Sequence, residues 1–137
     1  MKVLKEKGNY WYHHYCISKC IYHVVFCTKF RRKVLDDEIQ DLIKNIIKEK
    51  QKEWLYKVHS LEVCEDHVHI LLQVDPELGI NNIVAKIKGL TSGIIRKNYP
   101  RVKSRIPTLW TRGRFIASVG SVSKETVKKY IEDQPRS

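Results

Sequence analysis

Two histidines separated by one residue, His67 and His69, are of a type and spacing that could bind a metal ion. They begin an apolar run that ends near Val74 and is typical of a strand. Successive side chains of a strand point to opposite faces, so both imidazoles should lie on one face while Val68 points to the other. Neutral imidazole nitrogens are good ligands for divalent ions. The pair therefore predicts a two-nitrogen metal platform, although two histidines that simply face solvent are the alternative.

Near the end of the sequence, Tyr130 and Gln134 are four residues apart, which places them on one face of a helix. The amide oxygen of Gln134 could be a third ligand for Mg²⁺ or Mn²⁺, and such an ion could grip a phosphate. A tyrosine beside a polarised phosphate can attack phosphorus and form a covalent phosphotyrosine. Taken alone, Tyr130 is better explained as an ordinary surface aromatic of an amphipathic helix, and the combination with the histidine pair favours the nucleophile. The adjacent apolar stripe, Val127 and Ile131, is expected to dock this helix on the body of the protein.

Hydrophobic periodicity and turn residues predict the elements that would position these side chains. In chain order, we expect a loose arm over 1–14, a strand over 15–28, a helix from Asp36 or Asp37 to about 53, strands over 56–64 and 67–74 joined by a tight turn at Glu65 and Asp66, a helix from 80 to Pro100, a basic loop over 101–105, a strand over 109–119 and a helix capped by Ser123 that runs to Gln134. This order, β-α-β-β-α-β followed by an added helix, predicts an α+β, ferredoxin-like fold with an antiparallel sheet. We expect a single domain over 1–137.

The charge of the chain indicates an anionic partner. Lys and Arg number 26 against 15 Asp and Glu, for a formal net charge of +11. Nucleic acid fits this excess best, because the basic residues are spread along the chain and do not form one amphipathic membrane helix. The sequence has no apolar run of the roughly 20 residues that a membrane span needs, which predicts a cytoplasmic protein without membrane contact. The cysteines are expected to be buried free thiols: Cys16, Cys20, Cys27 and Cys64.

Five segments in order resemble the HUH single-tyrosine transposases of bacterial and archaeal insertion sequences, the TnpA-like enzymes. The segments are YHVVFCTKFRR (22–32), EDHVHILL (65–72), LWTRGRF (109–115), VGSVS (119–123) and VKKYIEDQ (127–134). The resemblance covers nearly the whole chain. It implies that His67, His69 and Gln134 bind the metal, and that Tyr130 becomes linked to the 5′ phosphate of a cut single strand, leaving a free 3′ hydroxyl. It also implies a homodimer and a substrate of single-stranded DNA hairpins at the ends of the element.

Basic residues in three parts of the chain could contact DNA phosphates, although solvated surface charge is the alternative for each one. They are Lys29, Arg31, Arg32 and Lys33, then Lys86 and Lys88, then Arg112 and Arg114. Two other functions are alternatives to transposition for this chain. One is a domesticated or replication-type nicking endonuclease, and the other is a ferredoxin-like domain that binds single-stranded nucleic acid without catalysis. The second predicts that the loss of Tyr130 leaves DNA binding unchanged.

Overall fold

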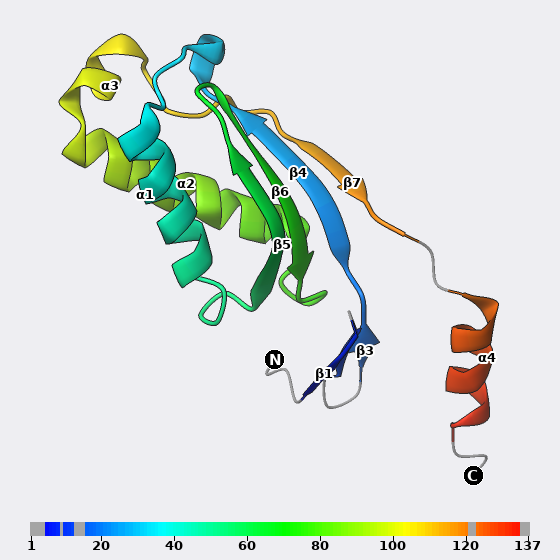
Figure 1. Cartoon of the computed structure of the whole chain (residues 1–137). Helices are drawn as coiled ribbons and strands as arrows, with labels where there is room; N and C mark the ends of the chain where they lie inside the picture. Colours follow the sequence, from blue (N-terminus) through cyan, green and yellow to red (C-terminus); the bar gives the residue numbers. More distant parts are fainter. Residues whose placement is uncertain (1–4, 9, 13–15, 121–122, 135–137) are drawn as a thin grey trace.

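The computed structural model describes residues 5–8, 10–12, 16–120 and 123–134, and its centre is a four-stranded antiparallel sheet in the order β5-β6-β4-β7. Its strands are β4 (Ile21–Cys27), β5 (Tyr56–Val63), β6 (His67–Val74) and β7 (Phe115–Ser118). The helices α1 (Asp37–Glu49) and α2 (Ile80–Asn98) lie on one side of the sheet (Figure 1). The first and third strands of the β-α-β-β-α-β unit are central, which is the ferredoxin-like arrangement that the sequence predicts.

The core forms between this sheet and the two helices, and strand alternation determines which residues enter it. Val68, Ile70 and Leu72 of β6 are fully buried, as are Val24 and Phe26 of β4. The helices contribute residues at helical spacing, among them Ile39, Ile43 and Ile47 from α1 and Ile83, Val84 and Ile87 from α2. The alternate residues of β4 and β6, the histidines among them, therefore lie on the opposite face of the sheet. We call this the open face, because neither α1 nor α2 covers it.

Several predicted element bounds need correction. The predicted strand over 15–28 is divided into β3 (Ile17–Ser18) and β4, and α1 ends at Glu49, before the predicted 53. The expected basic loop over 101–105 is a short helix, α3 (Pro100–Arg105), because Pro100 occupies a first-turn position where its fixed φ favours a helix start. The last strand starts at Phe115, because Leu109 and Trp110 are buried in the core as part of a connecting segment.

The amino-terminal segment is also more ordered than expected. The strands β1 (Lys5–Lys7) and β2 (Tyr10–Tyr12) pair with each other, and β2 pairs with β3, so that these form a small second sheet. Trp11 is only 5 % exposed. The expectation of a loose arm is therefore wrong for the described part of residues 1–14. Residues 13–15, which were predicted to end the arm and to start the strand over 15–28, lie outside the described residues.

The last helix, α4 (Lys124–Glu132), begins where the sequence predicts. Ser123 caps it by accepting a hydrogen bond from the backbone N–H of Thr126. The four cysteines are free thiols as expected, but all four are only partly buried. Among the described residues, none of the helices is long and apolar enough to cross a membrane.

Candidate functional site

His67 and His69 lie on the same face of β6, as the strand spacing predicts. Each side chain is partly exposed, whereas Val68 between them is fully buried on the helix side. Their strand neighbours confirm the arrangement, because His67 pairs with Cys27 and His69 pairs with Val25, both of which alternate with the buried Val24 and Phe26. The two imidazoles therefore share the open face near the turn that joins β5 to β6.

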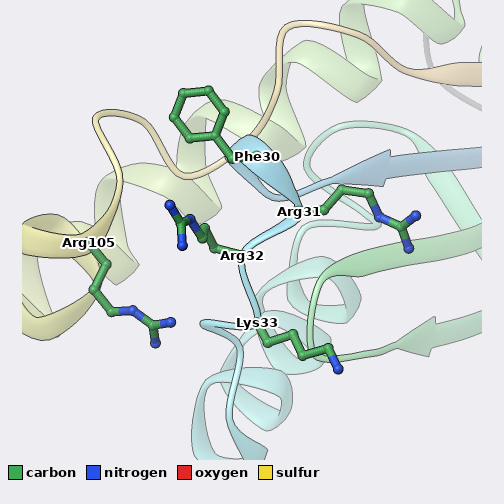
Figure 2. A pocket seen from close by; sticks show the side chains of 5 residues that line it. All are labelled: Phe30, Arg31, Arg32, Lys33 and Arg105. Carbon is green, nitrogen blue, oxygen red and sulfur yellow. The ribbon is translucent and has the colours of Figure 1, made fainter.

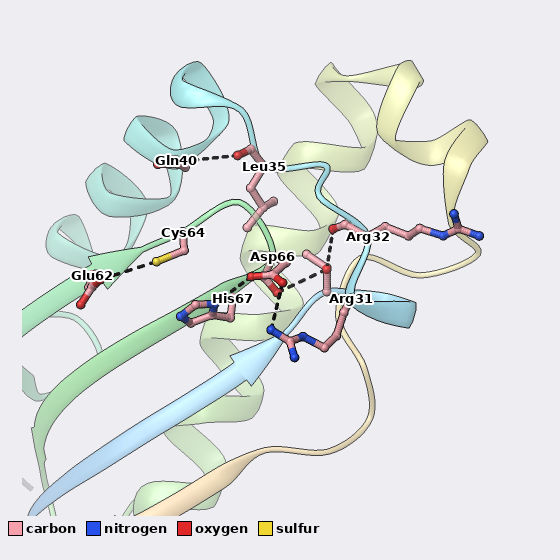
Figure 3. A network of polar contacts seen from close by, with 9 residues as sticks. Arg31, Arg32, Leu35, Gln40, Glu62, Cys64, Asp66 and His67 are labelled. Carbon is pink, nitrogen blue, oxygen red and sulfur yellow. Dashed lines mark hydrogen bonds and ion pairs between the residues drawn. The ribbon is translucent and has the colours of Figure 1, made fainter.

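A carboxylate holds His67 in one orientation (Figure 3). Asp66 Oδ1 lies 2.8 Å from His67 Nδ1, and Asp66 Oδ2 accepts a hydrogen bond from Arg31 Nη2 at 3.1 Å. The hydrogen bond to His67 and the nearby charge of Arg31 lower the pKa of the Asp66 carboxyl. An ionised carboxylate can only accept hydrogen bonds, so the proton of a neutral His67 belongs on Nδ1 and the lone pair is on Nε2. His67 can thus present Nε2 to a ligand.

A third histidine, His23 on β4, adjoins the pair. His23 Nδ1 lies 3.3 Å from His69 Nε2, and the centroids of the two rings are 5.4 Å apart. His23 was not among the predicted site residues. Strand alternation carries a usable signal, because His23 stands one residue before the buried Val24 and therefore points to the open face once β4 and β6 are paired.

These side chains form an incomplete metal site. In the described part of the chain, no three His, Cys, Asp or Glu side chains are grouped so that they could hold an ion by themselves. The chemistry of the set still suits a divalent ion, because His67 has a free nitrogen oriented by a carboxylate and His69 lies on the same face. A ligand from elsewhere would be required to complete the coordination.

Tyr130 lies in the last turn of α4, whereas Gln134 lies two residues beyond the end of the helix at Glu132, so α4 is shorter than the predicted helix to Gln134. Gln134 Nε2 donates a hydrogen bond to the backbone oxygen of Tyr130 at 3.1 Å, and the Tyr130 side chain is 49 % exposed. In Figure 1, α4 stands apart from the four-stranded sheet. The structure therefore brings His67 and His69 together but does not place Tyr130 and Gln134 beside them.

The apolar stripe of α4 does not dock on the body of the same chain, contrary to the sequence prediction. Val127 is 47 % exposed and Ile131 is 64 % exposed. The two residues line a shallow hollow together with Lys124, Lys128 and Glu132. The stripe has the spacing of a buried face, and its exposure is explained if its partner is not in the same chain.

A shallow basic cleft lies beside the short 3₁₀ helix η1 (Lys29–Arg31), which follows β4. It is lined by Phe30, Arg31, Arg32, Lys33 and Arg105 (Figure 2). The guanidinium groups of Arg32 and Arg105 lie on the same side of the segment, whereas Arg31 extends the opposite way, toward Asp66. Within the described part of the chain, Arg32, Lys33 and Arg105 have no ion-pair partner, so their charge is available to an anion.

Phe30 is the large hydrophobic residue of this cleft and is 66 % exposed. Phe30 and Arg31 both have left-handed backbone angles, with φ of 58° and 52°. The amino group of Lys29 lies 5.1 Å from the centre of the Phe30 ring. An exposed aromatic ring beside free guanidinium groups could contact a base and its phosphate at the same time. The sequence interpretation included the cations of this segment but missed Phe30 and Arg105.

The other predicted DNA contacts differ in their environments. Lys88 is engaged within the protein, because its Nζ donates to the backbone oxygens of Thr111 at 2.7 Å and Gly113 at 3.3 Å. Burial, followed by the charge of Arg114, lowers the pKa of Lys88. Lys86 lies 5.3 Å from the centre of the Trp54 ring, and Arg114 donates a hydrogen bond to Asn81. Arg112 is exposed.

Comparison with known proteins places this chain in a family. The ISDra2 transposase TnpA of Deinococcus radiodurans is 32 % identical over 115 residues, which are 82 % of each chain. The transposase of insertion sequence IS200 from Salmonella typhimurium is 29 % identical over 118 residues, covering 84 % of this chain and 76 % of the relative.

Two solved structures share the fold. A transposase structure from Deinococcus radiodurans R1 superposes with a TM-score of 0.71 at 29 % identity, covering 95 % of this chain and 98 % of the other. The REP-associated tyrosine transposase bound to a REP hairpin superposes with a TM-score of 0.58 at 11 % identity, covering 88 % of this chain and 67 % of the other. At that identity, the second likeness concerns the fold alone.

The ferredoxin-like sheet, its paired histidines and these relatives together define a DNA transposase. The match to the family model for IS200-like transposases extends over residues 6–134, nearly the whole sequence. The chain belongs to the IS200-like transposase family.

Proposed function

We propose that this transposase cuts and rejoins single-stranded DNA at the ends of an insertion sequence, with Tyr130 as the nucleophile. The observation that carries the proposal is the oriented histidine pair: His67, with Nε2 left free by its contact to Asp66, shares one face of β6 with His69. In a chain of the IS200-like family, such a pair is suited to activate a phosphate. The phenol of Tyr130 is exposed and therefore accessible to a large substrate.

The residues present fit a divalent metal ion, and we assign His67, His69 and Gln134 as its ligands. Two imidazole nitrogens and one amide oxygen carry no charge, which leaves the ion its full positive charge and open positions for phosphate oxygens. Mg²⁺, or Mn²⁺ in its place, would polarise the scissile phosphate and stabilise the charge that develops on it. Asp66 keeps the His67 ring in the orientation that this role requires.

The reaction that follows is a phosphoryl transfer to Tyr130. The phenolate oxygen attacks phosphorus, an oxygen–phosphorus bond forms, and the bond from phosphorus to the 3′ oxygen breaks. The leaving 3′ oxygen takes up a proton and becomes a free hydroxyl, while the 5′ phosphate stays on Tyr130. When the 3′ hydroxyl of another cut end attacks this phosphotyrosine, the DNA is rejoined and the phenol is released, so no external energy source is required.

We further propose that the active unit is a homodimer in which α4 serves the histidine pair of a second copy. Two observations support this assembly: α4 stands apart from its own sheet (Figure 1), and its apolar residues Val127 and Ile131 are exposed. An amphipathic helix gains stability by burying its apolar stripe. A partner surface would bury the stripe and bring Tyr130 and Gln134 to the histidines in one step.

For the substrate, we propose DNA hairpins near the ends of the element, bound in the cytoplasm. The related REP-associated tyrosine transposase was solved with a REP hairpin, and the net charge of +11 suits a polyanionic partner. The cleft at η1 offers the cations Arg32, Lys33 and Arg105 for phosphate contacts. Exposed Arg112 offers a further contact near β7.

The test is covalent capture of labelled hairpin DNA from the ends of the element, analysed on a denaturing gel with and without Mg²⁺. We expect a metal-dependent protein–DNA adduct that is absent in Tyr130→Phe, because that variant loses only the nucleophilic oxygen. Hairpin binding by Tyr130→Phe should equal that of the wild type. An adduct that persists in the variant would remove Tyr130 from the mechanism, and binding without any adduct in the wild type would favour a non-catalytic binder.

A further inference from the structure

We infer that Arg31 and Asp66 are positioning residues that act on the metal site through His67, and that Arg31 is thereby distinct from the other cations of the η1 segment. This inference depends on the proposed metal role of His67. The contacts form a continuous chain, in which Arg31 Nη2 lies 3.1 Å from Asp66 Oδ2 and Asp66 Oδ1 lies 2.8 Å from His67 Nδ1 (Figure 3). Each carboxylate oxygen has its own partner, so rotation of the carboxylate would break both contacts.

The backbone around Asp66 is fixed as firmly as its side chain. The Asp66 backbone oxygen accepts hydrogen bonds from the N–H of Thr28 at 2.9 Å and from the Thr28 hydroxyl at 3.3 Å. These bonds attach the β5–β6 turn to the end of β4. Thr28 is fully buried, so this attachment is protected from water. The backbone of Asp66, which bears the carboxylate, is therefore fixed relative to both β4 and β6.

The η1 segment gives Arg31 its direction. The Thr28 hydroxyl also lies 2.7 Å from the backbone oxygen of Arg32, which closes the segment into a tight turn. Within this turn Phe30 and Arg31 adopt left-handed backbone angles, a conformation that non-glycine residues rarely take. Strain of this kind persists only where the surrounding structure enforces it, and it is common at functional sites. Here it directs Arg31 to Asp66 and away from the cations of the cleft (Figure 2).

The consequence for His67 is a defined tautomer. With Nδ1–H donating to Asp66, Nε2 keeps its lone pair and the ring cannot turn without losing this hydrogen bond. Arg31 donates to the other carboxylate oxygen and so keeps the carboxylate turned toward His67. An exposed ion pair that served stability alone would contribute little, since such pairs are weak. A pair that orients a metal ligand should instead affect metal affinity, for which losses of about 10- to 100-fold are typical.

The experiment measures Mn²⁺ affinity by electron paramagnetic resonance on the full chain in the presence of hairpin DNA. We expect Asp66→Ala to weaken binding about 10-fold or more and Arg31→Gln to weaken it by a smaller factor, with partial recovery in Arg31→Lys. Lys103→Gln is the control, because it removes a cation of α3 that neither contacts Asp66 nor lines the cleft at η1. His67→Ala provides the reference for the loss of a ligand.

A second readout needs no metal. Nitrogen-15 NMR of the histidine rings should show His67 with its proton on Nδ1 in the wild type, and loss of that preference in Asp66→Ala. Unchanged Mn²⁺ affinity in Asp66→Ala and Arg31→Gln, or a wild-type His67 protonated on Nε2 alone, would overturn the inference and leave the proposed function intact. A wild-type chain that binds no Mn²⁺ would overturn the metal role itself, and with it this inference.

Discussion

Asp36 shows how much one exposed carboxylate contributes outside the site. Its side chain accepts a hydrogen bond from the backbone N–H of Ile39 at 3.1 Å, which caps α1, and it also pairs with Arg101 of α3. The backbone hydrogen bond from Ile39, followed by the contacts with Arg101, lowers the pKa of Asp36. Asp36 therefore stabilises the helix that covers the sheet behind the histidines.

We predict that Asp36→Ala lowers the free energy of unfolding by about 1 kcal/mol at neutral pH, the usual effect of losing an N-cap. Because the folded-state pKa is depressed, this stabilisation is present above the unfolded-state value, about 3.9, and is lost as the pH falls through the folded value. Urea denaturation of both proteins at pH 7 and at pH 3 measures the difference. Asp36→Asn is the control, since asparagine also caps helices. A gap between wild type and Asp36→Ala that stayed constant down to the lowest pH would contradict the assignment.

Among the site residues, those whose positions follow from local spacing were predictable. Strand alternation placed His67 and His69 on one face, and helical spacing placed Tyr130 and Gln134 together. His23 and Arg105 were not found, because each reaches its neighbours through strand pairing or helix packing that spacing along the chain does not reveal. The surroundings of Lys88 could not be predicted from spacing either. A lysine of α2 suggests a phosphate contact, yet its amino group lies against backbone oxygens of the segment after Trp110.

At the scale of elements, the sequence predicts the fold best where one periodicity continues through a whole segment. The β5–β6 hairpin and α2 agree with expectation because alternation or helical spacing continues through most of each, although the pairing of β5 with β6 shifts register between Val58 and Ser60. The segment before β7 misled the interpretation, because the apolar Leu109 and Trp110 resemble a strand but are buried by packing in a connecting segment. The indole N–H of Trp110 donates to the Thr91 hydroxyl at 3.0 Å, a contact between distant positions that no local pattern contains.

The exposed stripe of α4 leads to the second prediction. Changing Val127 and Ile131 together to Ser should shift the chain from dimer to monomer in sedimentation velocity, because the variant removes the apolar area that a partner would bury. The same variant should lose covalent capture while Tyr130 remains in place. Lys129→Ser is the matched control, since Lys129 lies on another face of the same exposed helix. A double variant that stays dimeric and active would show that α4 does not mediate assembly.

At the scale of the whole molecule, the net charge of +11 favours electrostatic binding to DNA, and this binding depends on salt concentration. Binding to a polyanion releases condensed counterions, so the logarithm of the affinity falls linearly with the logarithm of salt concentration. The cations differ in their availability: Arg31 and Lys88 have partners inside the protein, whereas Arg32 and Arg105 face the cleft with no ion-pair partner in the described part of the chain. The net charge alone therefore overestimates the number of phosphate contacts.

This difference in availability gives the last prediction. Arg32→Gln and Arg105→Gln should each weaken hairpin binding and reduce the slope of log affinity against log salt by about 1, the change expected for one lost phosphate contact. Lys103→Gln is the control, because Lys103 lies on α3 with Arg105 and does not line the cleft. Fluorescence anisotropy over a range of salt concentrations measures the slopes. If Lys103→Gln changed the slope as much as Arg105→Gln does, the DNA would be bound by diffuse charge over the whole surface. A change confined to the cleft variants would show that the DNA phosphates lie beside η1. The same segment contains Arg31, which contacts Asp66 and, through Asp66, orients His67.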